Sequence, residues 1–251
     1  MTTERISTAL ITGGSRGIGA ATALALAARD FDSIITYRNK AARAEGVVAE
    51  IVAQGRRGLA LAADMTRADD VAALFARAAT WADGLDLLIL NASGGLERDL
   101  LAEAPDYPIR LNRDAQLATV DAALPLLRQG ATIVFITSHW AHRYGQVTQL
   151  PAYEAVAASK HAGEVALRAR QEEFAARGIR LLVVTGDLIE GTITPKLLAR
   201  AAAAQGLAAD TPQGLPTATE MGTAIAVAAL ERALPSGHTT IVGRALDTLD
   251  G

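Results

Sequence analysis

The feature that most constrains this chain is the alternation of short apolar runs with longer alanine-rich stretches. The runs have the length of strands, and their nearly continuous apolar character is typical of strands covered on both faces. They lie at Thr8–Thr12, Ser33–Tyr37, Gly58–Ala63, Leu85–Asn91, Ala131–Thr137, Ile179–Thr185 and Thr239–Val242. Helical patterns separate them, at Gly17–Arg29, Ala41–Gln54, Ala68–Ala82, Asn112–Arg128, Ala155–Arg177 and Thr217–Ala233. Alternation of this kind predicts an α/β fold, with right-handed crossovers between parallel strands.

Length and composition bound the organisation of the chain. An α/β fold of 251 residues is commonly one domain, and no Pro-, Gly- or Ser-rich linker divides the sequence. We therefore expect a single domain over residues 1–251. The segment 192–215 is predicted to form a lid, because the tract Ala201–Ala204 favours helix. Its leucines, Leu197, Leu198 and Leu207, are either an apolar substrate face or ordinary packing of that helix.

Charge and cysteine content exclude several classes of function. The formal net charge is −3, which gives no electrostatic basis for binding nucleic acid or an anionic membrane. The chain has no cysteine, so disulfides and thiolate metal sites are excluded. The first residues contain neither a signal-peptide core nor a membrane span. We expect a cytoplasmic protein.

A glycine-rich turn joins the first predicted strand to the first helix. Its sequence from Thr12 to Gly19 is TGGSRGIG. Glycines at these spacings let the backbone turn tightly and approach a pyrophosphate, while the helix N-terminus offers free N–H groups to phosphates. The pattern predicts a dinucleotide-binding loop on a Rossmann-type, doubly wound parallel sheet of about seven strands with helices on both faces. The residues predicted to line the cofactor are Gly13, Ser15, Arg16, Gly17, Ile18 and Gly19.

The end of the second predicted strand favours NADP(H) over NAD(H). A site for NAD(H) usually has Asp or Glu there, whereas this chain has Arg38, and an arginine accommodates a 2′-phosphate. Arg16 is a second candidate cation, because guanidinium pairs strongly with phosphate. The alternative is that both arginines are solvated surface residues.

Two further strand ends carry polar residues, and ligands of open α/β sheets bind at the carboxyl ends of strands. Asp64 and Met65 follow the third run, where Asp64 is either an acceptor for the adenine amino group or a residue that caps the next helix. Asn91, Ala92 and Ser93 follow the fourth run and are expected to pass close to the cofactor ribose.

Taken together, these motifs resemble those of the short-chain dehydrogenase/reductase family, in order and over essentially the whole chain. Thr12–Gly19 is similar to the family's cofactor loop, and Asn91-Ala92-Ser93-Gly94 to its NAG segment. Ser159-Lys160 is similar to the close of its YxxxK motif, and Thr185-Gly186 with Thr192 to its PG segment.

The resemblance implies roles for individual residues. Ser138 is the counterpart of the serine that holds the substrate oxygen, and Asn112 of the asparagine that supports a water chain. Lys160 would lower the pKa of a catalytic tyrosine and bind the nicotinamide ribose. Gly186 and Thr192 would hold the nicotinamide carboxamide. The implied activity is transfer of a hydride between a nicotinamide and a carbonyl or alcohol.

The position four residues before Lys160, where the family has its tyrosine, is Val156, which cannot exchange a proton. Tyr153 lies seven residues before Lys160, on the same helical face and roughly 10 Å away along the axis. A long side chain reaching from the loop before the helix can span that distance. Tyr153 is therefore the leading candidate for the proton donor, the alternative being a pocket-wall or packing tyrosine.

Two other routes for the proton stay open. His139 follows the fifth predicted strand and has an ordinary pKa near ~6.5 that suits proton exchange. Ser138 with an ordered water is the other. A metal is not expected beside His139 and His142, because no third histidine or carboxylate lies at ligand spacing.

The sequence supports three functional hypotheses. The first is an NADP(H)-dependent ketoreductase acting on a small apolar carbonyl or alcohol with an altered proton relay. The second, suggested by Val156, is a catalytically silent sensor or scaffold, and the third is a non-redox lyase. The stretch Ala155–Arg177 is a candidate surface for a homodimer or homotetramer, or else its charges at Arg168, Arg170, Glu172 and Glu173 form a solvated face.

Overall fold

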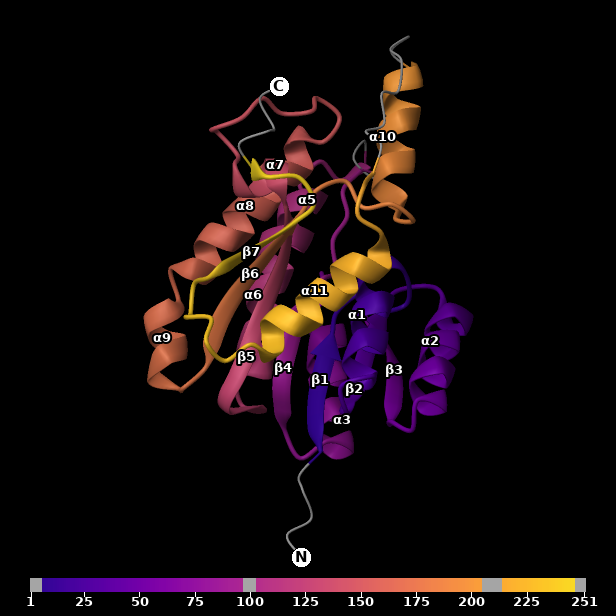
Figure 1. Ribbon diagram of the computed structural model, residues 1–251, viewed down its shortest axis with the longest axis vertical. Coiled ribbons are helices and arrows are strands. Elements are labelled where there is room, and N and C mark those ends of the chain that lie inside the picture. Colours follow the sequence, from indigo (N-terminus) through magenta and orange to yellow (C-terminus); the bar gives the residue numbers. More distant parts are fainter. Residues whose placement is uncertain (1–5, 97–102, 205–213, 247–251) are drawn as a thin grey trace, which may run out of the picture.

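The computed structural model describes residues 6–96, 103–204 and 214–246. Its centre is a seven-stranded sheet in the order β3-β2-β1-β4-β5-β6-β7, with every pair of neighbours parallel (Figure 1). The strands are β1 (Ser7–Ile11), β2 (Phe31–Tyr37), β3 (Gly58–Ala62), β4 (Leu85–Leu90), β5 (Leu127–Ser138), β6 (Arg180–Gly186) and β7 (Thr239–Val242). The predicted doubly wound parallel sheet is confirmed.

Helices cover both faces of the sheet, and the sheet separates the core that each set of helices forms with it. On one face lie α1 (Gly17–Ala27), α2 (Ala41–Ala53) and α11 (Ala218–Leu230), packed on the alternate side chains of β1, β2 and β4. On the other lie α3 (Ala68–Trp81), α6 (Ala115–Ala123), α8 (Glu154–Arg168) and α9 (Gln171–Ala176). Both faces of the central strands are buried, which explains why their sequences are continuous apolar runs.

The strand order reverses between β1 and β4, which are neighbours in the sheet although β2 and β3 separate them in the chain. The connections from these two strands leave toward opposite faces, so their carboxyl ends open a crevice. Figure 1 shows this end of the sheet at the top, with α10 (Ile193–Ala204) standing beyond it. The fold therefore places a ligand site between the β1 and β4 loops and beneath α10.

Two predicted helices differ from the observed ones. The stretch Ala155–Arg177 is two helices, because the chain turns after Ala169. At the turn, Arg170 N donates to Leu167 O, three residues back instead of the four of an α-helix. The turn lets Phe174 enter the core, where it is fully buried. The stretch Asn112–Arg128 begins earlier, with α5 (Tyr107–Ile109) and a π-helical turn η1 (Arg110–Asp114), and it ends earlier, because β5 already begins at Leu127.

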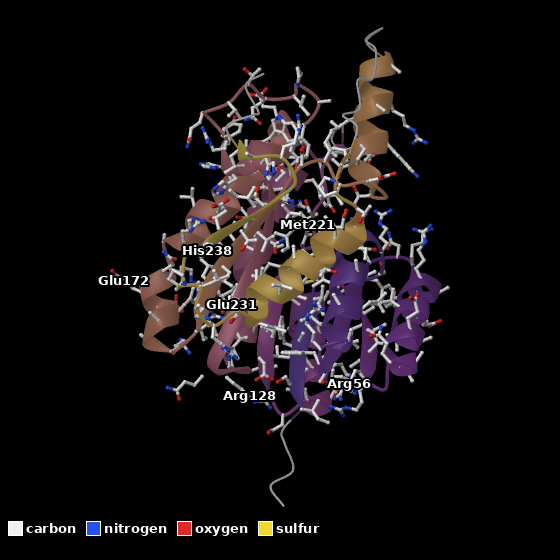
Figure 2. All side chains as sticks on the ribbon, viewed as in Figure 1. Arg56, Arg128, Glu172, Met221, Glu231 and His238 are labelled. Carbon is white, nitrogen blue, oxygen red and sulfur yellow. The ribbon has the colours of Figure 1, made fainter. Side chains whose placement is uncertain are left out.

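Some of the charged side chains predicted to form a face on Ala155–Arg177 are engaged in ion pairs. Arg168 pairs with Glu164 at 2.8 Å, and Arg170 pairs with Asp121 at 2.7 Å. Glu172 points away from the body of the protein on α9 (Figure 2).

The segment predicted to form a lid contains α10 over residues 193–204, whereas Leu207 and the rest of 205–213 lie outside the described residues. The role of this segment as a lid stays a prediction. Helix α11 begins with a capping box in which Thr217 and Glu220 bond each other's backbone N–H groups. Within the described ranges, none of the helices combines the length and apolar character needed to span a bilayer.

Candidate active site and cofactor cavity

The glycine-rich turn is built to bring two loops into close contact. The backbone of Gly13 is left-handed (φ +67°), and an added Cβ would lie 3.1 Å from Ala92 Cα. A Cβ on Gly19 would lie 2.5 Å from Asn91 Nδ2. The Asn91 amide donates to Thr12 O at 2.8 Å, and Thr12 Oγ1 accepts from the backbone N–H of Asn91 at 2.9 Å. The loops after β1 and β4 are thereby fixed as one rigid wall.

A cavity of about 600 Å³ lies against this wall, within the ordinary range for cofactor sites. Gly17 faces it with a left-handed backbone (φ +54°), and an added Cβ would meet only Thr192 Cγ2, at 3.7 Å. Thirteen of the predicted cofactor-binding residues line it, namely Gly13, Ser15, Arg16, Gly17, Ile18, Gly19, Arg38, Asp64, Met65, Asn91, Ala92, Ser93 and Thr192.

Positive charge predominates in this cavity. Arg16 and Arg38 both line it and are exposed toward solvent. Sequence reasoning missed two further cations that line it, Arg43 at the start of α2 and Lys196 on α10. Arg43 stands five residues after Arg38, close to the same strand end, which is the signal that could have identified it. Cations from the loops after β1 and β2 and from helices α2 and α10 match the charge of a phosphorylated nucleotide.

Asp64 supplies the carboxylate in this cavity. Its Oδ1 accepts hydrogen bonds from the backbone N–H of Thr66 at 3.0 Å and from the Thr66 hydroxyl at 2.7 Å. Burial alone would raise the pKa of Asp64, but these hydrogen bonds, together with the positive charges of Arg38 and Arg67, hold it below its ordinary value. The cap-type alternative does not describe this geometry, because helix α3 begins after Arg67 and has no side-chain cap.

A second cavity of about 150 Å³ continues from the first and shares Arg16, Ile18, Asn91, Ser93, Gly94 and Thr192 with it. It lies at the carboxyl ends of β5 and β6 and contains Ser138, Tyr153, Lys160 and Gly186. Val156 faces it too, one turn into α8, where it is buried. The structure thus brings together three of the five predicted catalytic residues.

Tyr153 and Ser138 are directly hydrogen-bonded. Tyr153 immediately precedes α8, and its hydroxyl donates to Ser138 Oγ at 2.9 Å. Ser138 Oγ also accepts from Ala141 N at 3.2 Å, so the serine proton remains available for another acceptor. Burial raises the pKa of Tyr153 above its ordinary value, an effect that the Ser138 hydrogen bond partly opposes. The phenol is therefore protonated at neutral pH.

Lys160 projects from the same helix into the second cavity. Within the described residues, its ammonium group makes no ion pair or hydrogen bond, so no negative charge offsets the cost of removing it from water. Burial lowers its pKa to about 8. A half-buried cation without a protein partner is suited to binding hydroxyl or phosphate oxygens of a ligand.

Asn112 does not line either cavity but supports both walls. Its amide donates to Gly94 O and to Ser159 Oγ, each at 3.0 Å. It lies in the π-helical turn η1, which packs so closely on α8 that a Cβ on Gly163 would lie 2.2 Å from Asn112 O. In this arrangement Asn112 joins the loop after β4 to the helix that carries Lys160.

The structure does not bring His139 into the site. The side chain is completely buried beneath the end of β6, where Nδ1 pairs with Thr185 Oγ1 at 3.0 Å. Burial lowers its pKa, so the imidazole is neutral. His139 is not among the residues that line either cavity.

Sequence reasoning also missed several residues that shape the second cavity. Its apolar lining includes Leu96, Trp140, Leu188 and Met221. Leu197, which the sequence offered as either a substrate face or helix packing, lines this cavity too. Figure 2 shows Met221 at the end of α11 nearest this region. Asp187 is the buried carboxylate there, and Arg244 holds it with two bonds of 2.6 and 3.1 Å. That ion pair connects the end of β6 to the segment after β7.

Solved structures with the same fold include proteins in complex with NADP or NADPH. The chain is 30% identical to a short chain dehydrogenase from Burkholderia cenocepacia in complex with NADP, with a TM-score of 0.78 over 97% of this chain and 98% of that one. It is 25% identical to a blue fluorescent protein from a metagenomic library in complex with NADPH, with a TM-score of 0.76 over 94% and 95% of the two chains.

Sequence comparison gives relatives that are named as reductases. A 1-cyclohexenylcarbonyl-CoA reductase from Streptomyces collinus is 33% identical over 192 residues, which is 75% of this chain and 67% of the relative. A tetrahydroxynaphthalene reductase from Pestalotiopsis fici is 36% identical over 159 residues, or 62% and 56% of the two chains. The family model described as short chain dehydrogenase matches residues 7–201, and the chain belongs to that family.

Proposed function

We propose that this protein is an NADP(H)-dependent ketoreductase that uses Tyr153, in place of a tyrosine at position 156, as its proton donor. The observation that carries the proposal is the Tyr153–Ser138 hydrogen bond at the floor of a cavity that continues into a cation-lined one. Two hydroxyls in contact at the point where a nicotinamide ring would end are suited to protonating a carbonyl oxygen.

The residues present fit the cofactor. The glycine cradle leaves room for a pyrophosphate against the N-terminus of α1. Arg16, Arg38 and Arg43 supply the charge for a 2′-phosphate, and Lys160 is placed to bind ribose hydroxyls. The NADP and NADPH held by two proteins of similar structure support this assignment. When bound, the nicotinamide supplies the hydride for the substrate carbon.

The hydroxyl pair handles the proton. Ser138 Oγ accepts from Tyr153 and can donate its own hydrogen to a carbonyl oxygen, so a proton passes from Tyr153 to the substrate directly or through Ser138. A protonated phenol can donate the proton that reduction of a carbonyl requires, whereas oxidation of an alcohol requires a phenolate to accept one. Asn112 acts as a positioning residue in this scheme.

The lining of the second cavity supports a small apolar substrate. Leu96, Trp140 and Leu188 form part of its wall, and Leu197 of α10 faces it from above. Apolar walls with a few convergent polar groups are typical of specific small-molecule sites. The homodimer or homotetramer expected from the sequence and the cytoplasmic location stay predictions.

The test is NADPH oxidation with a panel of cyclic, aromatic and aliphatic ketones, with cofactor binding measured in parallel. We expect NADPH to be consumed with at least one apolar ketone. Control compounds that lack a carbonyl group should leave it unchanged. Tight NADPH binding with no turnover on any substrate would favour the sensor or scaffold instead. Product formation without net NADPH oxidation would favour the lyase. The absence of binding to either nicotinamide cofactor would refute the proposal.

A further inference from the structure

We infer that Tyr107 is the residue that sets the preference for a 2′-phosphorylated cofactor, by holding Arg38 at the mouth of the nucleotide cavity. The inference rests on the proposed function, since it assigns a positioning role within the proposed NADP(H) site. Tyr107 belongs to α5 and lines the same cavity as Arg38, which directly follows the end of β2.

The contact between these residues is close. Arg38 Nη1 donates to the Tyr107 hydroxyl at 2.6 Å, and Arg38 Cζ lies 6.0 Å from the centre of the Tyr107 ring. The two residues are separated by 69 positions in the chain, and both line the nucleotide cavity, so the bond joins two distant segments at its surface. A long, exposed arginine is thereby restricted to one arrangement before any ligand arrives.

Tyr107 is itself held firmly. Its side chain is buried, with 6% of its surface exposed. The next residue, Pro108, packs against the loop after β4, where a Cβ on Gly95 would lie 2.8 Å from Pro108 Cγ. Five residues further on, Asn112 bonds Gly94 O in the same loop. The tyrosine therefore offers a rigid acceptor, which can orient a flexible arginine at little entropic cost.

An alternative position for Arg38 is an ion pair with Asp64, which would neutralise its positive charge in the site. Asp64 lies on the same side of the cavity, and the Arg38 charge already contributes to lowering the pKa of that carboxyl. Within the described residues, Arg38 forms no ion pair with any carboxylate. A hydrogen bond to a neutral hydroxyl leaves the full positive charge available, whereas pairing with Asp64 would neutralise it. Tyr107 therefore keeps Arg38 ready for a phosphate dianion.

The test is the affinity of the full-length Tyr107→Phe variant for NADPH and NADH, measured by calorimetry together with 2′,5′-ADP and 5′-AMP. We expect the variant to bind NADPH and 2′,5′-ADP about tenfold more weakly, because the orienting bond is lost. NADH and 5′-AMP, which lack the 2′-phosphate, should bind as they do to the unchanged protein. Equal weakening of both pairs, or no change in either, would overturn the inference.

A double-mutant cycle separates positioning from general damage. In the Arg38→Met background, Tyr107→Phe should have no further effect on NADPH affinity, because there is no guanidinium left to position. Tyr144→Phe, at a tyrosine that lines neither cavity, serves as the matched control and should change nothing. Failure of the unchanged protein to bind any of the four ligands would refute the proposed cofactor site itself, a result distinct from failure of the Tyr107 role.

Discussion

The hydroxyl of Tyr153 lies 2.9 Å from Ser138 Oγ, although Tyr153 stands just before α8 rather than within it. Val156, one turn into the helix, faces the same cavity but offers only methyl groups. The phenol reaches the serine because its backbone lies outside the helix and the side chain extends back over the cavity. The Tyr153 hydroxyl thus meets Ser138 from a position three residues before Val156.

The pH dependence of cofactor capture should report on Lys160. Its pKa in the free protein is about 8, because burial disfavours the charged form. The positive charge is present below this pH and is lost above it. We therefore expect kcat/KM for NADPH, which reflects ionisations of the free enzyme, to fall above pH about 8 toward tenfold per unit. Steady-state rates across a pH series measure this.

The Lys160→Arg variant is the matched comparison, because a guanidinium keeps its charge throughout the range. Its profile should lose the alkaline limb even if its absolute rate is low. An alkaline limb of the same position in both proteins would show that Lys160 is not the group responsible.

Two glycines in helices should respond oppositely to alanine. Alanine favours helix over glycine by about 1 kcal/mol. In Gly46→Ala this gain stands alone, because nothing lies within 4 Å of the new Cβ, and stability should rise by about 0.5–1 kcal/mol. In Gly163→Ala the Cβ would lie 2.2 Å from Asn112 O, and the overpacking cost of about 1–3 kcal/mol exceeds the gain.

Urea unfolding of both variants measures these changes. Gly163→Ala should also lower kcat, because it pushes η1 away from α8 and disturbs Asn112. Equal stabilisation by both substitutions would mean that α8 and η1 do not approach as closely as described.

The buried carboxylate of Glu164 should stabilise the fold in a pH-dependent manner. It accepts from Arg168 Nε at 2.8 Å and pairs with His142 Nδ1 at 2.9 Å, joining α8 to the turn after Ser138. Burial alone would raise its pKa, but these partners lower it below the ordinary value of 4.5. Its contribution is therefore complete above pH 4.5 and is lost as the pH falls through the lower folded-state value.

The Glu164→Gln variant should lose about 2–3 kcal/mol of unfolding free energy at neutral pH, discounted for the partial exposure of Arg168. The difference from the unchanged protein should shrink in denaturant titrations near pH ~4. Glu172→Gln, at the exposed glutamate on α9, is the control and should change stability by less than about 0.5 kcal/mol. A loss that does not depend on pH would point to packing rather than charge.

The sheet and the nucleotide cavity were predictable because their signals are local. Buried parallel strands require apolar runs, and the close approach of the β1 and β4 loops requires Gly13 and Gly19 whatever else the chain does. Arg38 follows from its place at a strand end. Each of these signals is carried by a short stretch of sequence, even where the contact that it permits joins distant segments.

The remaining features depend on contacts between distant segments. No sequence pattern around Tyr107 indicates that it meets Arg38, because the bond joins α5 to the end of β2, 69 positions away in the chain. The break between α8 and α9 involves neither Gly nor Pro but the burial of Phe174. His139 stands next to Ser138 in sequence, yet the start of α7 (His139–His142) turns its ring beneath β6.

The most direct test of the proposed chemistry is the Tyr153→Phe variant, assayed for NADPH-dependent ketone reduction with NADPH affinity measured alongside. Loss of the phenolic proton should lower kcat by about 10²–10⁴-fold, while NADPH binding stays within about twofold. Tyr144 packs at a tilt against His161, with ring centroids 5.8 Å apart, and lines neither cavity, so Tyr144→Phe should retain full activity. A Tyr153→Phe protein that binds NADPH and still reduces the ketone at the unchanged rate would contradict the account.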